Sequence, residues 1–74
     1  MLDMKTITAD GRYRVSTVEF PEHTPWGELF ETMVFDTEID DEVDSRRYAT
    51  REEAVHGHEA MTQEVTLIED ALRL

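Results

Sequence analysis

Residues 50–73 read TREEAVHGHEAMTQEVTLIEDALR, and this stretch decides the fold because apolar residues recur in it at intervals of three and four. That spacing is typical of a helix with one apolar stripe. Thr50 and Glu53 have the capping-box spacing, in which each side chain satisfies a free backbone donor of the other. The sequence predicts a helix over about 51–73. Its inward positions are Ala54, His58, Met61, Val65, Ile68 and Leu72, and its solvated positions are Glu52, Glu59, Gln63, Glu64, Glu69 and Asp70.

The residues before this helix have the period of strands. Asp10-Gly11 is a strong hairpin signal, and the alternating run that follows it indicates a second strand. Val18 and Phe20 have the opposite parity to Tyr13 and Val15, which indicates either a bulge near 16–17 or a strand that is apolar on both faces. The prolines at 21 and 25 predict a loop over 21–28. Strands are expected at about 4–9, 12–20 and 29–36, with a short edge strand possible at 46–48.

These elements predict one small α+β domain over residues 1–74, an antiparallel β-meander of three to four strands with one C-terminal helix packed on one face. The helix would be about 34 Å long, while a seven-residue strand spans about 23 Å. Its last turns are therefore expected either to fray or to bury Val65, Leu67, Ile68, Leu72 and Leu74 against a second copy in a homodimer. The predicted core comprises Ile7, Tyr13, Val15, Val18, Leu29, Met33, Phe35, Ala54, Met61, Val65 and Ile68.

Composition excludes several classes of function. The 74 residues carry 18 acidic and 7 basic side chains, a net charge of -11 that repels phosphate backbones and anionic membranes. Cysteine is absent, which excludes disulfides, thiolate zinc sites and cysteine nucleophiles. The longest apolar run is Met33–Phe35, and the first five residues lack a signal-peptide apolar region. The expected location is the cytoplasm or a virion, and the expected partner is a protein with a basic surface.

The acidity is concentrated in one block of nine residues, 36–44. It contains six acids and no cation, and it predicts an exposed loop. A calcium-loop interpretation fails because the sixth position would be Asp41 instead of glycine and the twelfth would be Arg47 instead of glutamate. The block is instead a candidate surface for a basic partner, together with Trp26. Its acids are Asp36, Glu38, Asp40, Asp41, Glu42 and Asp44.

No motif indicates catalysis or a cofactor. Glu53 and His56 have the Glu-x-x-His spacing of di-iron helices, and His58 follows, but one helix supplies at most half of such a site even in a dimer. His56 is expected on the surface, and His58 is expected to be inward or half-buried and bonded to backbone. The three glycines, at 11, 27 and 57, form no phosphate-binding motif. No catalytic, metal or cofactor residues are therefore assigned.

Aromatic residues offer a second candidate surface. One helix covers only one face of a small sheet, so the other face is open. Trp26, Phe30 and Phe35 are the candidates for binding there, and core packing is the favoured interpretation for Phe30 and Phe35.

The ordered motifs ETMVF at 31–35, RYAT at 47–50, EEA at 52–54 and GHE at 57–59 resemble a group of short uncharacterised proteins carried by phages and prophages of high-GC bacteria. The resemblance covers about residues 12–65. It implies a viral accessory or virion protein and supplies no catalytic residues. Six arginines against one lysine fit high-GC coding, and the excess of acid also fits halophilic adaptation, in which acidity serves hydration in strong salt.

Three functions from different classes follow as expectations. The first is a non-enzymatic protein-binding role, as a minor virion component at a head or tail interface. The alternative is an acidic nucleic-acid mimic that inhibits a host or defence protein through residues 36–44. The third is a metal enzyme through Glu53, His56 and His58, which the missing ligands argue against.

Overall fold

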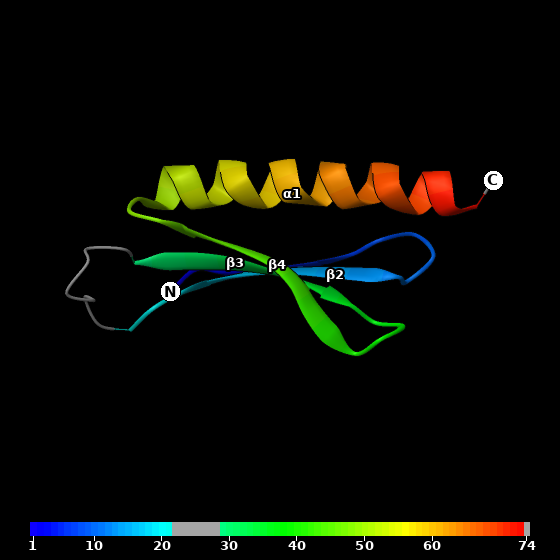
Figure 1. Cartoon of the computed structure of the whole chain (residues 1–74). Coiled ribbons are helices and arrows are strands. Elements are labelled where there is room, and N and C mark those ends of the chain that lie inside the picture. The colour runs from blue at the N-terminus through cyan, green and yellow to red at the C-terminus, as the bar shows by residue number, and fades with distance from the viewer. Residues whose placement is uncertain (22–28, 74) are drawn as a thin grey trace.

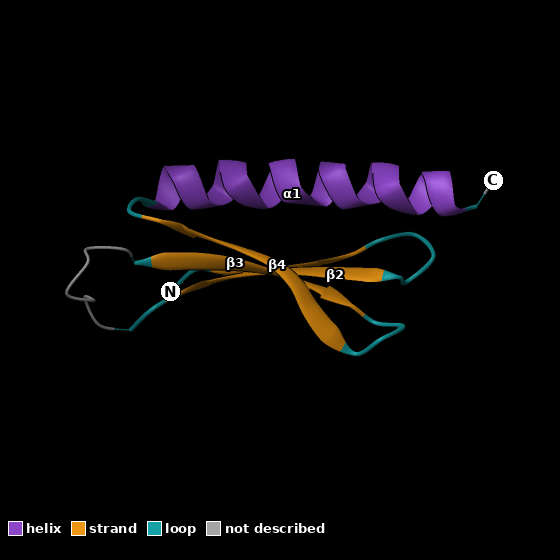
Figure 2. Cartoon of the chain, viewed as in Figure 1, coloured by secondary structure: helices purple, strands orange, loops and turns teal. Residues whose placement is uncertain are grey.

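Four antiparallel strands form one sheet in the order β1-β2-β3-β4, and one helix lies across a single face of it (Figures 1 and 2). The computed structural model describes residues 1–21 and 29–73. The elements are β1 Asp3–Ile7, β2 Tyr13–Glu19, β3 Phe30–Asp36, β4 Asp41–Tyr48 and α1 Arg51–Leu72. The predicted α+β class, a β-meander with a C-terminal helix, is confirmed.

The start of α1 is held by the predicted cap. The hydroxyl of Thr50 accepts the backbone N–H of Glu53 at 3.1 Å. It also donates to Oε1 of Glu53 at 2.9 Å, so the return contact is made between side chains instead of reaching the backbone N–H of Thr50. Two of the early residues of α1, Glu52 and Glu53, are acidic, which suits the positive end of the helix dipole.

The core lies between α1 and the inner face of the sheet. Odd positions of β2 pair with even positions of β3, so that Val15 lies opposite Val34 and Thr17 opposite Thr32. Because side chains alternate along a strand, these pairs all point toward the helix. The buried apolar side chains are Leu2, Tyr13, Val15, Phe30, Val34, Ala54, Met61 and Val65.

Part of the predicted core was wrong because the faces of β3 were reversed. Phe30 is in the core, whereas Met33 and Phe35 lie half-buried on the outer face, with Arg14 stacked 4.7 Å from the ring of Phe35. The register of β2 is regular, so the shift in its apolar parity reflects a strand that is apolar on both faces, and Val18 also points outward. Leu29 is only partly buried, at the margin of the core. Ile7 and Ile68 were wrongly placed, being 63% and 43% exposed.

The predicted acidic loop at 36–44 is mostly strand. Asp36 ends β3, and β4 begins at Asp41, so only residues 37–40 form the turn. Asp40 has a φ of 53°, a left-handed conformation that Asp tolerates better than most residues. The loop prediction failed because strand pairing with β3 compensates the self-repulsion of the acids.

The far end of α1 is attached to the β1–β2 turn by Glu69. This side chain is 2% exposed, and its carboxylate accepts the N–H of Asp10 at 3.0 Å, the N–H of Arg12 at 3.1 Å and the hydroxyl of Thr8. Burial raises the pKa of Glu69, but these hydrogen bonds outweigh that effect and hold the pKa below its ordinary value. The prediction that Glu69 is solvated was wrong, since the turn supplies three donors at its position.

This attachment explains why the long helix is ordered to Leu72. The helix lies over the sheet and the β1–β2 turn together, so its last turns are not left beyond the fold (Figure 1). Its large exposed apolar residues are Leu67, Ile68 and Leu72. A homodimer through them stays a prediction, and Leu74 lies outside the described residues.

Candidate functional site

The acidic residues predicted as a binding surface divide into two groups. Asp36 is 5% exposed and forms a two-pronged ion pair with Arg12, with Nε to Oδ1 at 2.9 Å and Nη2 to Oδ2 at 3.1 Å. The hydrogen bond from Arg12 holds the pKa of Asp36 below its ordinary value. Arg12 also contacts Glu38 at 2.7 Å. Asp36 is therefore a structural residue that ties the β1–β2 turn to the end of β3.

The other acids stay on the surface. Asp40, Asp41, Glu42 and Asp44 are exposed, and none of them has an ion pair with any residue in 1–21 or 29–73. Asp41, Glu42 and Asp44 lie on β4, which pairs with β3 on one side and is an edge of the sheet. The structure thus presents carboxylates along an exposed strand edge, which we call the acidic edge, residues 40–44.

A bulge shapes this edge. Asp44 lies opposite Val34 and Glu42 opposite Phe35, so Val43 is an extra residue in β4. Bulges increase local twist and bend the strand that carries them. The second half of β4 runs up toward the start of α1, whereas its first half swings away from the helix (Figure 1).

This divergence leaves a hollow between the first half of β4 and the second half of α1, which we call the β4–α1 notch. It has a volume of about 270 Å³. Exposed Val43 and Ile68 line it above the buried side chains of Val34, Met61 and Val65. Its polar lining residues are Tyr13, Asp36, Asp44 and Glu64.

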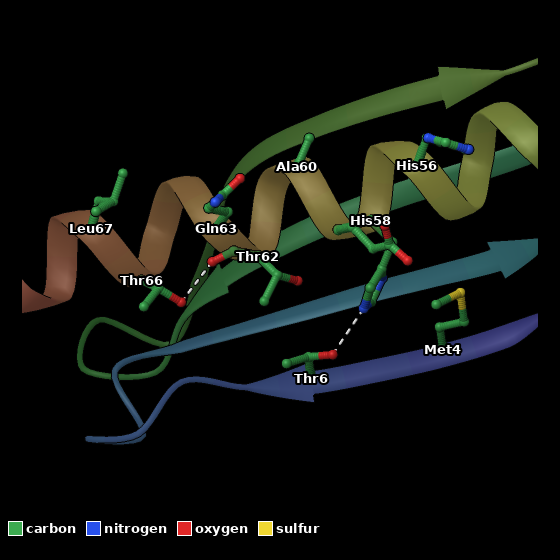
Figure 3. Close-up of a pocket in the computed structure, with 10 residues that line it drawn as sticks. Met4, Thr6, His56, His58, Ala60, Thr62, Gln63, Thr66 and Leu67 are labelled. Atoms are coloured by element: carbon green, nitrogen blue, oxygen red, sulfur yellow. Dashed lines mark hydrogen bonds between the residues drawn. The ribbon is translucent and has the colours of Figure 1, made fainter.

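The opposite flank of α1 carries a wider groove, the β1–α1 groove, of about 900 Å³ (Figure 3). The helix packs mainly on β2, β3 and β4, so the inner side of β1 is covered only in part. Met4 and Thr6 from β1 form one wall, and helix residues such as Gln63 and Leu67 form the other. The lining mixes hydroxyls, an amide and apolar groups with His56, His58 and the single carboxylate of Glu59, so it offers no concentrated charge to select a ligand.

A buried polar network lies at the base of this groove. His58 is 3% exposed, and its ring nitrogens lie 2.9 Å from the hydroxyl of Thr6 and 2.7 Å from that of Thr17. The Thr17 hydroxyl is 2.5 Å from that of Thr32 on the next strand. The expectation that His58 bonds to backbone was wrong, because two inward threonines, Thr6 and Thr17, supply side-chain hydroxyls. The sequence signal that could have indicated this bonding was the position of these threonines on the inward side of their strands.

The buried histidine predicts a loss of stability in mild acid. Burial lowers the pKa of His58 below 6.5, and the charge of Glu59 opposes this only in part. As the pH falls below 6.5, the unfolded chain takes up a proton that the folded chain does not, so the unfolding free energy decreases until the folded pKa is reached. Urea unfolding at about pH 7, 6 and 5 measures the slope. We expect His58→Gln to flatten it and the exposed-site control His56→Gln to leave it unchanged; equal slopes in both variants would contradict this assignment.

The three residues of the metal hypothesis, Glu53, His56 and His58, do not form a common site. Glu53 caps the helix through Thr50, His56 is exposed, and both nitrogens of His58 are engaged by threonines. Figure 3 shows His56 and His58 projecting in different directions from α1. Among residues 1–21 and 29–73, no group of three or more histidine or acidic side chains is arranged to hold a metal ion.

The aromatic candidates have separate outcomes. Phe30 belongs to the core, and Phe35 lies under Arg14 on the outer face. Trp26 lies outside the described residues, so its role as an interaction residue stays a prediction.

Comparison with known proteins supplies no further assignment. No protein-family model, curated protein or solved structure matches the chain. In the described part of the chain, no helix combines the length and apolar character needed to cross a bilayer.

Proposed function

We propose that this protein is a non-enzymatic binding protein whose acidic edge, residues 40–44, recognises a basic surface on another protein. One observation carries the proposal: Asp40, Asp41, Glu42 and Asp44 are exposed on and beside an edge strand without a cation to neutralise them in the described chain. Unneutralised carboxylates on a strand edge attract cations, steer association and repel acidic competitors.

The neighbouring structure supports a rigid recognition surface. The Arg12–Asp36 ion pair and the turn hydroxyl of Thr37, which donates to the carbonyl of Arg12 at 3.0 Å, hold the β3–β4 turn against the β1–β2 turn. A surface fixed in this way loses little conformational entropy on binding.

The resemblance to phage and prophage proteins indicates two kinds of partner, and it stays a prediction. A basic neighbour in the virion fits a minor structural role at a head or tail interface. A host or defence protein that binds nucleic acid fits the alternative role, in which carboxylates take the place of phosphates. The two differ in competition, since DNA or RNA should displace the protein only from a target of the second kind.

The experiment compares two variants that lose the same charge at different places. The edge variant carries Asp40→Asn, Asp41→Asn, Glu42→Gln and Asp44→Asn, and the control carries Asp3→Asn, Glu52→Gln, Glu59→Gln and Asp70→Asn. Asn at 41 and 44 keeps an acceptor for the backbone N–H groups of Glu42 and Ser45. Each protein is immobilised and exposed in turn to host-cell lysate and to disrupted, washed phage particles. The proteins that it retains are quantified by mass spectrometry.

We expect a basic protein that is retained by the wild type and the control and lost, by roughly tenfold or more, from the edge variant. Equal retention by the edge variant would refute the proposal. The salt concentration needed for folding is compared as well. If both variants instead fold at a lower salt concentration than the wild type, by the same amount, the acidity acts on hydration and the binding role is likewise refuted.

A further inference from the structure

We propose that the β4–α1 notch receives one apolar side chain from the partner, and that lysine or arginine flanks this side chain in the partner sequence. This inference rests on the proposed function, because it specifies the segment that the acidic edge selects. Its basis is the position of an apolar hollow beside that edge.

The lining indicates an apolar occupant. Val43 and Ile68 are 49% and 43% exposed, although both stand over buried core side chains. An aliphatic group seated between them would cover apolar surface on both walls and exclude water from it. The volume of about 270 Å³ is below the range of about 300–1,000 Å³ that is usual for small-molecule sites, so a single side chain is the better fit.

The rim indicates the flanking residues. Asp44 and Glu64 line the notch, and Asp41 and Glu42 precede it along β4. Two cations lie nearby: Arg12 is paired with the buried Asp36, and Arg46 lies 3.8 Å from Glu64, a long contact between two half-exposed side chains. Cations on either side of the inserted group would therefore meet Asp41, Glu42 and Asp44, which have no ion pair within the described residues.

The negative charge of the chain and of the notch rim argues against a second copy of the chain as the occupant. Each chain has a net charge of -11, and an interface centred on the notch would bring two acidic rims together. Repulsion between like-charged surfaces disfavours that assembly, while it favours a basic partner segment.

The test uses two short peptides, acetyl-Lys-Lys-Leu-Lys-Lys-amide and its counterpart with serine in place of leucine. Each is titrated into the full-length ¹⁵N-labelled protein at low ionic strength, and amide shifts are followed by NMR. We expect saturable shifts at Val43, Asp44, Val65 and Ile68 with the leucine peptide. The serine peptide should bind about tenfold or more weakly, since it has no aliphatic group to bury.

Two protein variants locate the leucine contact. Ile68→Ser removes one wall of the notch, and Leu67→Ser makes the same exchange at an exposed neighbour that lines the opposite groove. We expect Ile68→Ser to abolish the preference for the leucine peptide and Leu67→Ser to keep it. Circular dichroism verifies that both variants are folded.

Each contrary result has its own meaning. Equal affinity of the two peptides, with shifts confined to residues 40–44, overturns the notch inference and leaves the proposed function standing. Absence of saturable shifts with either peptide at about 1 mM overturns both. A dimer in size-exclusion chromatography that Ile68→Ser dissociates and Leu67→Ser does not would show a second copy in the notch and overturn the inference.

Discussion

Replacing Glu69 by alanine should lower the melting temperature by roughly 10 °C, the effect expected when three backbone and hydroxyl donors lose one buried acceptor. The hydroxyl of Thr8 and the N–H groups of Asp10 and Arg12 all donate to this carboxylate. Without it, the end of α1 keeps the exposed ion pair of Arg73 with Asp10 but loses its buried attachment to the β1–β2 turn. Thermal unfolding followed by circular dichroism measures the change.

Asp70→Ala is the matched control. Asp70 is the next residue along the helix and is exposed, and within residues 1–21 and 29–73 the ion pair of its side chain is a 3.6 Å surface contact with Arg73. Its removal should change the melting temperature little. Hydrogen exchange adds a local measurement, since the amides of Asp10 and Arg12 should lose protection in Glu69→Ala alone. Equal melting temperatures in the two variants would contradict the role assigned to Glu69.

Replacing Gly57 by alanine should destabilise the protein, in opposition to the intrinsic preference of a helix for alanine. Alanine in a helix interior is favoured over glycine by about 1 kcal/mol. A Cβ at Gly57 would, however, overlap Oη, Cζ and Cε1 of the Tyr48 ring at the end of β4. Overpacking of this kind costs about 1–3 kcal/mol, so the net effect should be a loss of stability in urea unfolding.

A double-mutant cycle with Tyr48→Ala separates the two contributions. In that background the space over Gly57 is open, and Gly57→Ala should stabilise the helix by up to about 1 kcal/mol relative to glycine. Ala60→Gly, at an exposed position of the same helix, should cost about the same amount. A stabilising effect of Gly57→Ala in the wild-type background would show that β4 yields to the added methyl group.

The helix and the meander were predictable because their signals are local. Thr50 and Glu53 mark the start of α1, and the three-and-four spacing marks its length. Asp10-Gly11 marks the first hairpin, with Gly11 at a φ of 76°, a left-handed conformation that glycine adopts without strain. Each signal depends on residues that lie close together in the sequence.

The face of β3 was not predictable in the same way. Residues 30–35 carry large apolar groups on both faces, so alternation alone did not distinguish Phe30 and Val34 from Met33 and Phe35. The register with β2 decides between them, since Val15 faces α1 and pairs with Val34. Register is a property of two strands, and its consequence for burial depends on where the helix lies.

The candidate site likewise has features that the sequence indicated and features that depend on residues distant in sequence. The acids of residues 36–44 were correctly singled out as a charged block, yet Arg12, twenty-four residues away, turns Asp36 into a buried structural carboxylate. The sequence likewise marked Glu69 as solvated, and a turn about sixty residues earlier surrounds it with donors. Ile68 was expected in the core, and the bulge at Val43 opens the notch that exposes it.

By itself, the sequence determined the fold class, the order of the elements, the two ends of the helix and the strong negative charge, because capping, periodicity and composition act locally or as sums over the chain. Only the tertiary structure decided which carboxylates are buried and which stay on the acidic edge, which face of β3 is the core, and where β4 leaves the helix. Those outcomes depend on contacts between residues distant in sequence, and the free energy of a buried charge or a bulged strand is set by the partners that the fold brings to it.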